Sequence, residues 1–375
     1  MCGIIGHVKK LINSPDTVVE DALAGFALAY PQYVTVHGLD GSGPVFIQRA
    51  GGVIPGKVGV VSGGGSGHEP LHGGFIGRGM LDAAAPGAMF TSPTPDQVLA
   101  AIQAADGGAG VLVIIKNYTG DVMNFEIGME LAQDLGIEVT SVLVVDDVAV
   151  ENSTYTIGRR GVAGTVLVER IAGAAAARGD NLAQVTDIAQ QVCDQVRSMG
   201  VALSACTVPH IGRPSFDLAE DEIELGIGMH GEPGRRRAPM APAHDLTRQL
   251  LVPILEDLGW GQASARDYAS QAGLGAGTEG RCAMLLVNGM GASSLSELYI
   301  VYASARGILA EYDVTVARSL VGNYVTSLDM QGVSITLLAC DDQMQALWDS
   351  PVDTVALSWG RCDPSAGRTS GDDLV

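Results

Sequence analysis

The stretch VLVIIKNYTGD, which runs from Val111 to Asp121, places a strand-like apolar run directly before a polar, glycine-containing turn. Its aliphatic residues, rich in valine and isoleucine, predict a strand that is buried on both faces. Similar runs occur at Val58 to Ser62 and at Val142 to Val145, with helical patterns at Thr94 to Ala104 and Asn124 to Leu135. Strand, glycine turn and helix in alternation predict an α/β domain with a mixed or mostly parallel sheet.

The second half of the sequence shows the same alternation. Helical patterns span Asp245 to Leu258 and Ser294 to Ile308, and apolar strand patterns span Cys282 to Val287 and Val333 to Leu338. The stretch Pro233 to Pro242 is rich in proline and arginine and is expected to be a loop. We therefore expect two α/β domains with sheets flanked by helices, at residues 1–185 and 186–375, because 375 residues exceed what one core usually serves.

Composition and charge exclude several classes of protein. Hydrophobic residues make up 47% of the chain and charged residues 17%, which favours packed cores over disorder. The formal net charge of −20 repels nucleic acid and anionic membranes, so we expect neither as a partner. No stretch reaches the roughly 20 apolar residues that a membrane span needs.

The six cysteines are scattered and form no CxxC pair, and we expect no bound metal. Buried reduced thiols and the lack of a signal-peptide pattern favour the cytoplasm. The opening Met1-Cys2-Gly3-Ile4-Ile5-Gly6 resembles the start of class II glutamine amidotransferases, but we interpret it as a coincidence or an unrelated extension. The small, polar end of the chain, Asp363 to Val375, is expected to fray.

Three polar clusters follow predicted strands, where ligands bind in α/β folds. The first is GGGSGHEP, residues Gly63 to Pro70, whose glycines let backbone N–H groups approach a phosphate or a polyhydroxy ligand. It fits neither a Walker A loop nor a dinucleotide fingerprint. The alternative interpretation is a glycine-rich turn with an incidental histidine.

The second and third clusters contain residues that could act as a catalytic acid, a base or a nucleophile. Lys116 and Asp121 leave the end of the strongest predicted strand, and Asp121 is expected in a glycine turn. Its alternative role is to form that turn or to cap a helix. His230 lies in GIGMHGEPG, among glycines that suit a loop better than a core, and its imidazole can act as base, ligand or nucleophile. The alternative is a loop histidine without a role.

Taken together, these clusters resemble the substrate-binding subunit family of dihydroxyacetone kinases over about residues 9–360. The motifs occur in the family's order, which is more specific than any one of them. They are GGGSGHEP, TSPTPDQ (Thr91 to Gln97), IIKNYTGDVMNFE (Ile114 to Glu126), GRRGVAGTV (Gly158 to Val166), ACTVP (Ala205 to Pro209), GIGMHGEPG (Gly226 to Gly234) and LVGNYVTSLDMQGVSITLL (Leu320 to Leu338).

The resemblance implies a role for each matching residue. The glycine loop cradles the sugar and Lys116 and Asp121 contact it, and His230 bonds covalently to the ketone carbon as a hemiaminal. His68 and Asp121 share the acid and base work. A covalent bond to a carbonyl would distinguish a ketone from glycerol, and a neutral His230 is required, so activity should fall at acid pH. The loop residues implied to bind the sugar are Gly65, Ser66, Gly67 and His68.

The resemblance also implies the partners. The chain is expected to end after the ketose-binding domains and to bind no cofactor itself. A helical subunit holding nucleotide and magnesium would then act on bound dihydroxyacetone, recharged in many bacteria by a phosphotransferase relay from phosphoenolpyruvate. A homodimer is expected. Open alternatives are a four-carbon ketose such as erythrulose, with His72 and Met229 tuning pocket size, and a ketose sensor that activates a transcription regulator.

Overall fold

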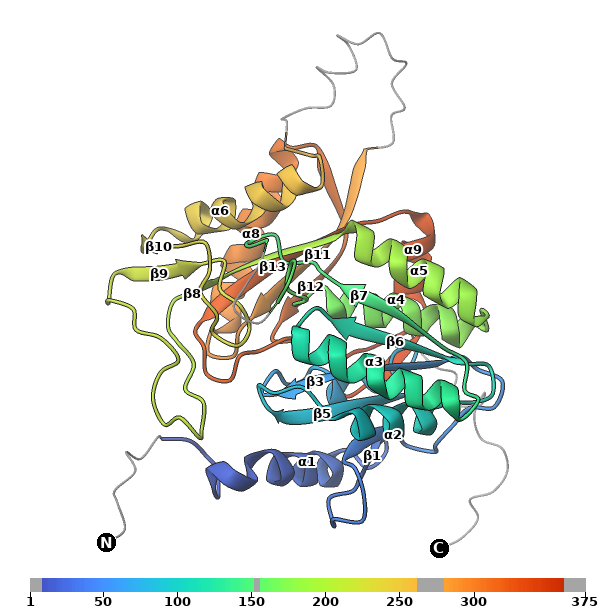
Figure 1. Cartoon of the computed structure of the whole chain (residues 1–375). Helices are drawn as coiled ribbons and strands as arrows, with labels where there is room; N and C mark the ends of the chain where they lie inside the picture. The colour runs from blue at the N-terminus through green and yellow to red at the C-terminus, as the bar shows by residue number, and fades with distance from the viewer. Residues whose placement is uncertain (1–8, 152–155, 262–279, 361–375) are drawn as a thin grey trace, which may run out of the picture.

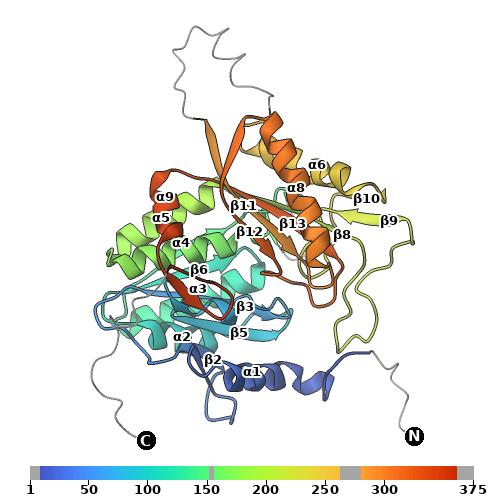
Figure 2. The ribbon, with the colours of Figure 1, turned by 180° about the vertical axis from the view of Figure 1, so that it is seen from behind.

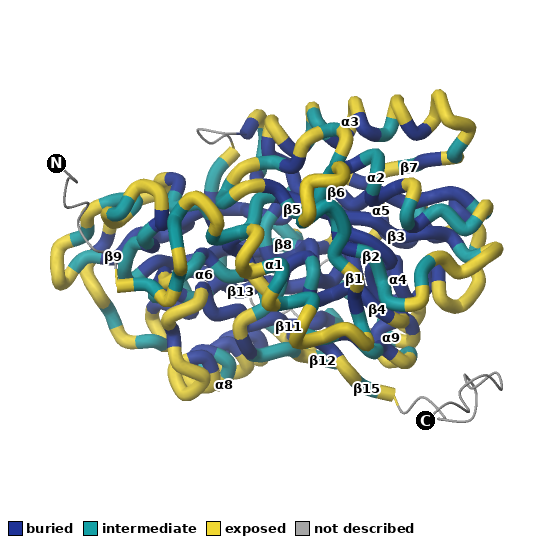
Figure 3. Tube along the Cα trace, turned by 90° about the horizontal axis from the view of Figure 1, so that it is seen from below, coloured by how far each residue is buried: buried dark blue, intermediate teal, exposed yellow. Residues whose placement is uncertain are grey.

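The computed structural model describes residues 9–151, 156–261 and 280–360, and it has the expected two α/β domains with sheets flanked by helices (Figure 1). The predictions for Cys2 and for the polar C-terminal end, Asp363 to Val375, lie outside these residues. In the described part of the chain, no helix has both the length and the apolar character needed to cross a membrane. The central strands of both sheets are mostly buried, as the dark blue interior of Figure 3 shows, and the edge strands are partly exposed.

The first domain contains a six-stranded sheet in the order β1-β2-β5-β3-β6-β7. Strands β5, β3, β6 and β7 pair in parallel, and β1 and β2 are antiparallel at one edge. The first-domain elements are η1 (Pro15–Thr17), α1 (Val18–Ala29), β1 (Val34–His37), β2 (Phe46–Arg49), β3 (Gly59–Ser66), η2 (Gly73–Phe75), β4 (Gly77–Arg78), β5 (Ala83–Met89), α2 (Pro95–Ala105), β6 (Val111–Lys116), α3 (Thr119–Asp134), β7 (Val139–Val144), α4 (Thr165–Arg178) and α5 (Leu182–Gln195).

Helices cover both faces of this sheet. Alternate residues of β6 belong to different apolar clusters, Val113 with α2 and α3 and Ile114 with α4 and α5. All six residues of β6 are buried for this reason, as the unbroken apolar run predicts. Helix α4 ends at Gly179, which adopts a left-handed conformation with φ of 97°.

The second domain contains a six-stranded mixed sheet in the order β10-β9-β8-β13-β11-β12, in which only β11 and β12 pair in parallel. Helices α6 and α8 pack on one of its faces. The elements are β8 (Val196–Ala202), β9 (Glu222–Leu225), β10 (Arg236–Pro239), α6 (Ala243–Asp257), β11 (Arg281–Gly289), α8 (Leu295–Glu311), β12 (Val314–Gly322), β13 (Gly332–Ala339), α9 (Asp342–Asp349), β14 (Val352–Thr354) and β15 (Ser358–Trp359).

The two halves share a core. One apolar cluster joins Ile114 of the first sheet and Val168 of α4 to Leu286 and Leu338 of the second sheet. The polypeptide passes from the first sheet to the second between β7 and β8, and α5 packs against the first sheet. Because the two halves share a core, the domain boundary expected near residue 185 stays a prediction.

The end of the described chain returns to the first domain (Figure 2). Strand β14 pairs with β4, with Asp353 opposite Arg78. The buried Arg170 of α4 ties the same regions together, because it donates to the carbonyl of Gly79 and to that of Trp348, each at 2.9 Å. A guanidinium with several carbonyl acceptors is a strong structural anchor.

Three local predictions were wrong. Strand β3 continues through the glycine run to Ser66, because Gly63 to Gly65 still pair with β5. Helix α3 begins at Thr119, so Asp121 lies in its first turn and not in a free glycine turn. The stretch Pro233 to Pro242 contains β10, whose antiparallel pairing with β9 overrides its proline- and arginine-rich composition.

Candidate active site

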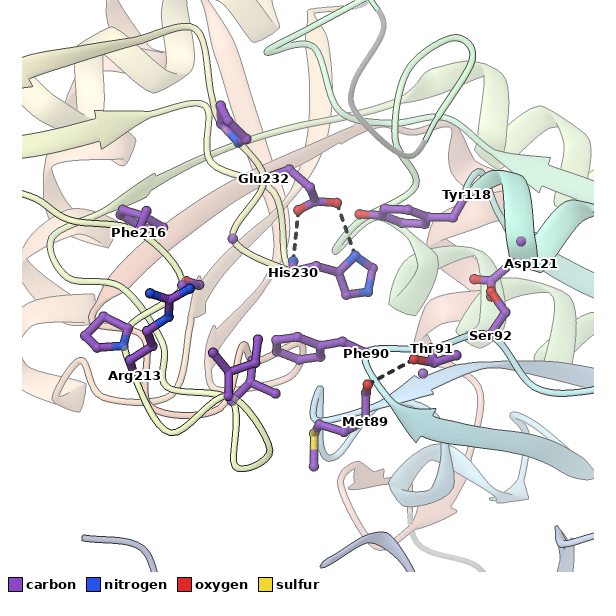
Figure 4. Close-up of a pocket in the computed structure, with 18 of the residues that line it drawn as sticks. Met89, Phe90, Thr91, Ser92, Tyr118, Asp121, Arg213, Phe216, His230 and Glu232 are labelled. Atoms are coloured by element: carbon purple, nitrogen blue, oxygen red, sulfur yellow. Dashed lines mark hydrogen bonds and ion pairs between the residues drawn. The ribbon is translucent and has the colours of Figure 1, made fainter. Parts of the chain in front are cut away.

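A cavity of about 910 Å³ lies where the two domains meet (Figure 4). Its wall includes three residues singled out from sequence, Gly65, Asp121 and His230, which come from β3, α3 and the loop after β9. Residues 208, 211 and 213–217 of the second domain form another part of the wall. More than a hundred residues of sequence separate Asp121 from His230, so only the fold brings them to one cavity.

His230 is oriented by Glu232 from the same loop. The imidazole Nδ1 lies 3.1 Å from Oε1 of Glu232, and the backbone N–H of His230 donates to Oε2 at 2.9 Å. Because a carboxylate only accepts, Nδ1 must carry the hydrogen. In the neutral ring the lone pair is then on Nε2, which is the arrangement a nucleophilic imidazole requires.

Glu232 remains ionised although its side chain is fully buried. Burial alone would raise the pKa of this carboxyl, but the charges of His230 and Arg160 and the hydrogen bond from His230 outweigh it and hold the pKa at about 2. Arg160 is itself fixed, since it pairs with Asp147 at 2.6 Å and donates to the carbonyl of Gly226 at 2.7 Å. The acceptor for Nδ1 is therefore permanent across the physiological pH range.

Aromatic rings surround the His230 imidazole on several sides. The ring centroids of Tyr118, His68 and Phe90 lie 4.6, 4.8 and 5.2 Å away, each in an edge-to-face arrangement. Figure 4 shows Tyr118 and Phe90 on opposite sides of the imidazole. These contacts restrict rotation of the ring and keep its reactive edge in a fixed direction.

His68 lies behind the cavity wall and is 1% exposed. Its Nδ1 is 2.8 Å from the carbonyl of Thr326, which can only accept, so Nδ1 carries the hydrogen. Its Nε2 is buried and has no hydrogen-bond partner among the described residues. Burial holds the pKa of His68 well below its usual value, and the neighbouring His230 adds to the effect. His68 is thus a neutral ring with a free acceptor nitrogen.

The glycines at the end of β3 allow its backbone to pack against the segment that follows β5. A Cβ on Gly65 would lie 2.6 Å from the backbone nitrogen of Thr91 and 2.8 Å from the carbonyl carbon of Phe90. Gly67 has φ of 106°, which a larger residue rarely adopts. Ser66 Oγ donates to the carbonyl of Gly87 at 2.7 Å and so braces β5. Neither Ser66 nor Gly67 is part of the cavity wall.

We expect Gly65→Ala to destabilise the protein by about 1–3 kcal/mol, because the new methyl group must displace backbone that has no flexible end. Gly25→Ala is the matched control, since Gly25 lies inside α1 with nothing within 4 Å of a new Cβ. That control should be neutral or stabilise by about 0.5–1 kcal/mol. Urea unfolding midpoints measure both changes, and equal midpoints for the two variants would contradict the expectation.

Lys116 is buried beneath the cavity and does not reach its wall. Its Nζ donates to the carbonyl of Gly63 at 2.8 Å, lies 2.8 Å from Nε2 of His72, and is 3.8 Å from Oδ2 of Asp121. Burial lowers the pKa of Lys116, while the charges of Asp121 and Glu169 act in the opposite direction. Asp121 is the one member of this group on the cavity wall.

Sequence reasoning gave no role to Glu232, Tyr118 or Phe90. Glu232 stands two residues from His230 inside a glycine-rich motif, and this spacing was the available signal. Phe90 directly follows β5, a strand that the sequence does not predict, so no sequence signal pointed to it. His72 and Met229, proposed to tune pocket size, are both buried away from the cavity wall. Among the described residues, no group of three or more His, Cys, Asp or Glu side chains is arranged to hold a metal ion.

Comparison with known proteins gives a consistent answer over nearly the whole chain. The family model described as Dak1 domain matches residues 24–356. The dihydroxyacetone-binding subunit of the PEP-dependent dihydroxyacetone kinase of Escherichia coli (strain K12) is 47% identical over 362 residues, which cover 94% of this chain and 100% of that protein.

Solved structures agree. The dihydroxyacetone kinase operon co-activator DhaQ superposes with a TM-score of 0.79 at 34% identity, covering 90% of this chain and 97% of that one. The dihydroxyacetone kinase of C. freundii in its native form superposes with a TM-score of 0.79 at 32% identity, covering 97% of this chain and 64% of that one.

Proposed function

Because this chain belongs to the Dak1 domain family and to its dihydroxyacetone-binding kinase subunits, we propose that it binds dihydroxyacetone through His230 for phosphorylation to dihydroxyacetone phosphate. One observation carries the proposal: an imidazole whose Nδ1 hydrogen is fixed by Glu232 shares one cavity with Asp121. A three-carbon ketose offers few contacts, so a covalent bond is an effective way to hold and select it.

The proposed addition is balanced within the site. Nε2 of His230 bonds to the ketone carbon, the electron pair of the carbonyl moves to oxygen, and that oxygen gains a proton. The ring releases its Nδ1 proton through Glu232 to solvent in the cavity, and solvent supplies one proton to the new oxygen. The net change is therefore one proton moved from Nδ1 to that oxygen, and Glu232 ends ionised. We assign Nε2 of His68 as the acceptor for the new hydroxyl, because it has no hydrogen-bond partner among the described residues and its ring centroid lies 4.8 Å from that of His230. Glycerol has no carbonyl and cannot form this adduct.

Asp121 is the base that we assign to the attacking hydroxyl. It lies on the cavity wall in the first turn of α3. Proton removal by a positioned carboxylate contributes about 10²–10⁴-fold to such a transfer. Lys116 acts on the substrate through Asp121, since its ammonium does not reach the wall.

The phosphoryl group would come from a separate helical subunit that holds nucleotide and magnesium, supplied through a phosphoenolpyruvate relay. Two relatives support this assignment, because their names describe PEP- or PTS-dependent kinases with a distinct dihydroxyacetone-binding subunit. A cavity of about 910 Å³ leaves room for a donor to approach a bound triose. It also leaves room for a four-carbon ketose such as erythrulose. A homodimer and a cytoplasmic location belong to the same proposal.

A ketose sensor is the second candidate. The co-activator DhaQ has the same fold at 34% identity over 90% of the chain, and this similarity supports the sensor as an alternative. In a sensor, the same His230 adduct would form, and the acid and base groups would serve no turnover.

Intact-protein mass spectrometry with dihydroxyacetone, and with glycerol as the control ligand, tests the adduct. We expect a mass increase of one ketose molecule with dihydroxyacetone and none with glycerol. A coupled assay with the helical nucleotide subunit then separates the two functions. Dihydroxyacetone phosphate formation supports the kinase, an adduct without turnover supports the sensor, and the lack of any adduct contradicts both.

A further inference from the structure

A chain of short polar contacts leads from the cavity wall into the protein interior. Asp121 Oδ2 lies 3.8 Å from Lys116 Nζ, which lies 2.8 Å from His72 Nε2. The opposite nitrogen of the same ring, Nδ1, is 2.6 Å from Oε1 of Glu169. Three of these four side chains have no part in the cavity wall, and the function proposed above gives no role to His72 or Glu169.

This series of contacts crosses the first sheet, and its side chains are buried apart from the Asp121 end, which meets the cavity. Asp121 belongs to α3 on one face, Lys116 ends β6, and Glu169 belongs to α4 on the other face. The side chains of Glu169 and Lys116 are 0% and 1% exposed, and those of His72 and Asp121 are 5% exposed each. Burying a carboxyl group at this depth is costly unless it has a specific partner.

Two proton arrangements use the same contacts. In the first, the Lys116 ammonium donates to Nε2 of His72, and Nδ1–H donates to the Glu169 carboxylate. In the second, a Lys116 amine accepts from Nε2–H, and Nδ1 accepts from the Glu169 carboxylic acid. Conversion breaks the N–H bond of Lys116 and the Nδ1–H bond, and forms Nε2–H and Oε1–H. One positive and one negative charge disappear together, and no outside acid or base is needed.

We propose that Glu169 is a positioning residue of this site, which shares one proton with Lys116 through His72 and so sets the charge that Asp121 and the bound ketose meet. The proposal rests on the ketose-binding function above and assigns its substrate site a buried, remote partner. His72 transfers the proton between Lys116 and Glu169, because an imidazole can receive a proton at one nitrogen while it releases another from the opposite one.

The electrostatics of the groups facing Lys116 agree with a shared proton. Burial raises the pKa of Glu169 to about 8, and the charge of Lys116 opposes that rise. Burial also holds the pKa of His72 well below its usual value, and the charge of Lys116 adds to this effect. Asp121 faces Lys116 from α3 and favours the ammonium form, and His68 is the remaining titratable neighbour. Burial thus favours the neutral form at both ends of the chain.

The protein is well suited to a direct test because it has four lysines, Lys9, Lys10, Lys57 and Lys116. Selective labelling of the lysine ε-carbons gives four NMR signals, and conservative arginine substitutions at the first three positions identify the fourth. In Glu169→Gln we expect the titration midpoint of the Lys116 signal to fall by about one pH unit or more, because the opposite charge is removed.

Asp82→Asn is the matched control. Asp82 is a buried carboxylate that pairs with Lys57 at 2.6 Å in the same domain, without contact to the chain. It should leave the midpoint of the Lys116 signal unchanged. An unchanged Lys116 midpoint in folded Glu169→Gln, or an equal shift in Asp82→Asn, would overturn the proposal.

Wild-type protein keeps the test decisive if Glu169→Gln does not fold. Nitrogen-15 signals of the His72 ring should titrate with the same midpoint as the Lys116 carbon, because one proton is shared along the chain. Separate midpoints would overturn the inference.

Ketose binding distinguishes this inference from the proposed function. In folded Glu169→Gln, the alkaline limit of dihydroxyacetone adduct formation should move to lower pH together with the Lys116 midpoint. A purely structural role would lower the yield equally at every pH, and that result would count against the proposal. If wild-type protein forms no adduct at any pH, the ketose function fails while the lysine titration still decides whether the proton is shared.

Discussion

His230→Ala should form no dihydroxyacetone adduct, and turnover with the nucleotide subunit should fall by at least about 10³-fold, because covalent holding replaces a very large effective concentration of substrate. The substitution removes the nucleophile and leaves Glu232 buried without its imidazole partner. Intact-protein mass spectrometry measures the adduct, and a coupled assay measures the rate.

His244→Ala is the control for the loss of a histidine as such. His244 lies exposed in the first turn of α6 and is not one of the residues that line the cavity. We expect wild-type adduct yield and rate from this variant. A His230→Ala protein that still gains the mass of one ketose would show that the covalent bond forms elsewhere, and the mechanism proposed here would be wrong.

Glu232→Gln should reduce adduct formation by about 10²-fold or more, although it changes one oxygen to an NH₂ group. A glutamine amide can turn its N–H toward Nδ1 of His230, which then accepts and places the ring hydrogen on Nε2. The nitrogen that must attack would have no lone pair. The rate of adduct formation measures this effect, and Glu232→Asp should restore part of it because the carboxylate returns.

The same substitution has a defined pH dependence. The pKa of Glu232 is about 2 in the folded protein and 4.5 ordinarily, so its carboxylate stabilises the fold above pH 4.5. This stabilisation is lost as the pH falls toward 2. The stability difference between wild type and Glu232→Gln, measured by urea unfolding, should therefore shrink over that range. Glu222→Gln, at a half-exposed pair 3.8 Å from Arg237, should show little difference at any pH.

The sequence predicts the fold class because its strongest signals come from burial on both faces. The unbroken apolar run at β6 predicts a strand between two helical layers, and its six residues are all buried. Strands β1, β2 and β5 were not predicted. The segment Ala83–Met89 of β5 is made of alanine, glycine, proline and methionine, which have low strand preference, and its place beside β3 is set by tertiary pairing.

The site shows a similar division between local and long-range information. That His230 and Asp121 share a cavity follows from resemblance, and no periodicity in the sequence brings them together. The hydrogen bond between Glu232 and His230 is local, and the motif spacing made it available to prediction. The contact of Phe90 with His68 and the link from His72 to Glu169 depend on residues far apart in sequence, so only the packed structure defines them.

The return of β14 to pair with β4 has a consequence for the order of events during synthesis. The ribosome releases the chain from its N-terminus, so Gly77 and Arg78 emerge long before Asp353 and Thr354 exist. Arg170 likewise has to wait for the carbonyl of Trp348. Until residues 348–354 have been synthesised, β4 lacks β14 as a partner strand, and Arg170 has the carbonyl of Gly79 but not that of Trp348, so chaperones have most to protect in this period.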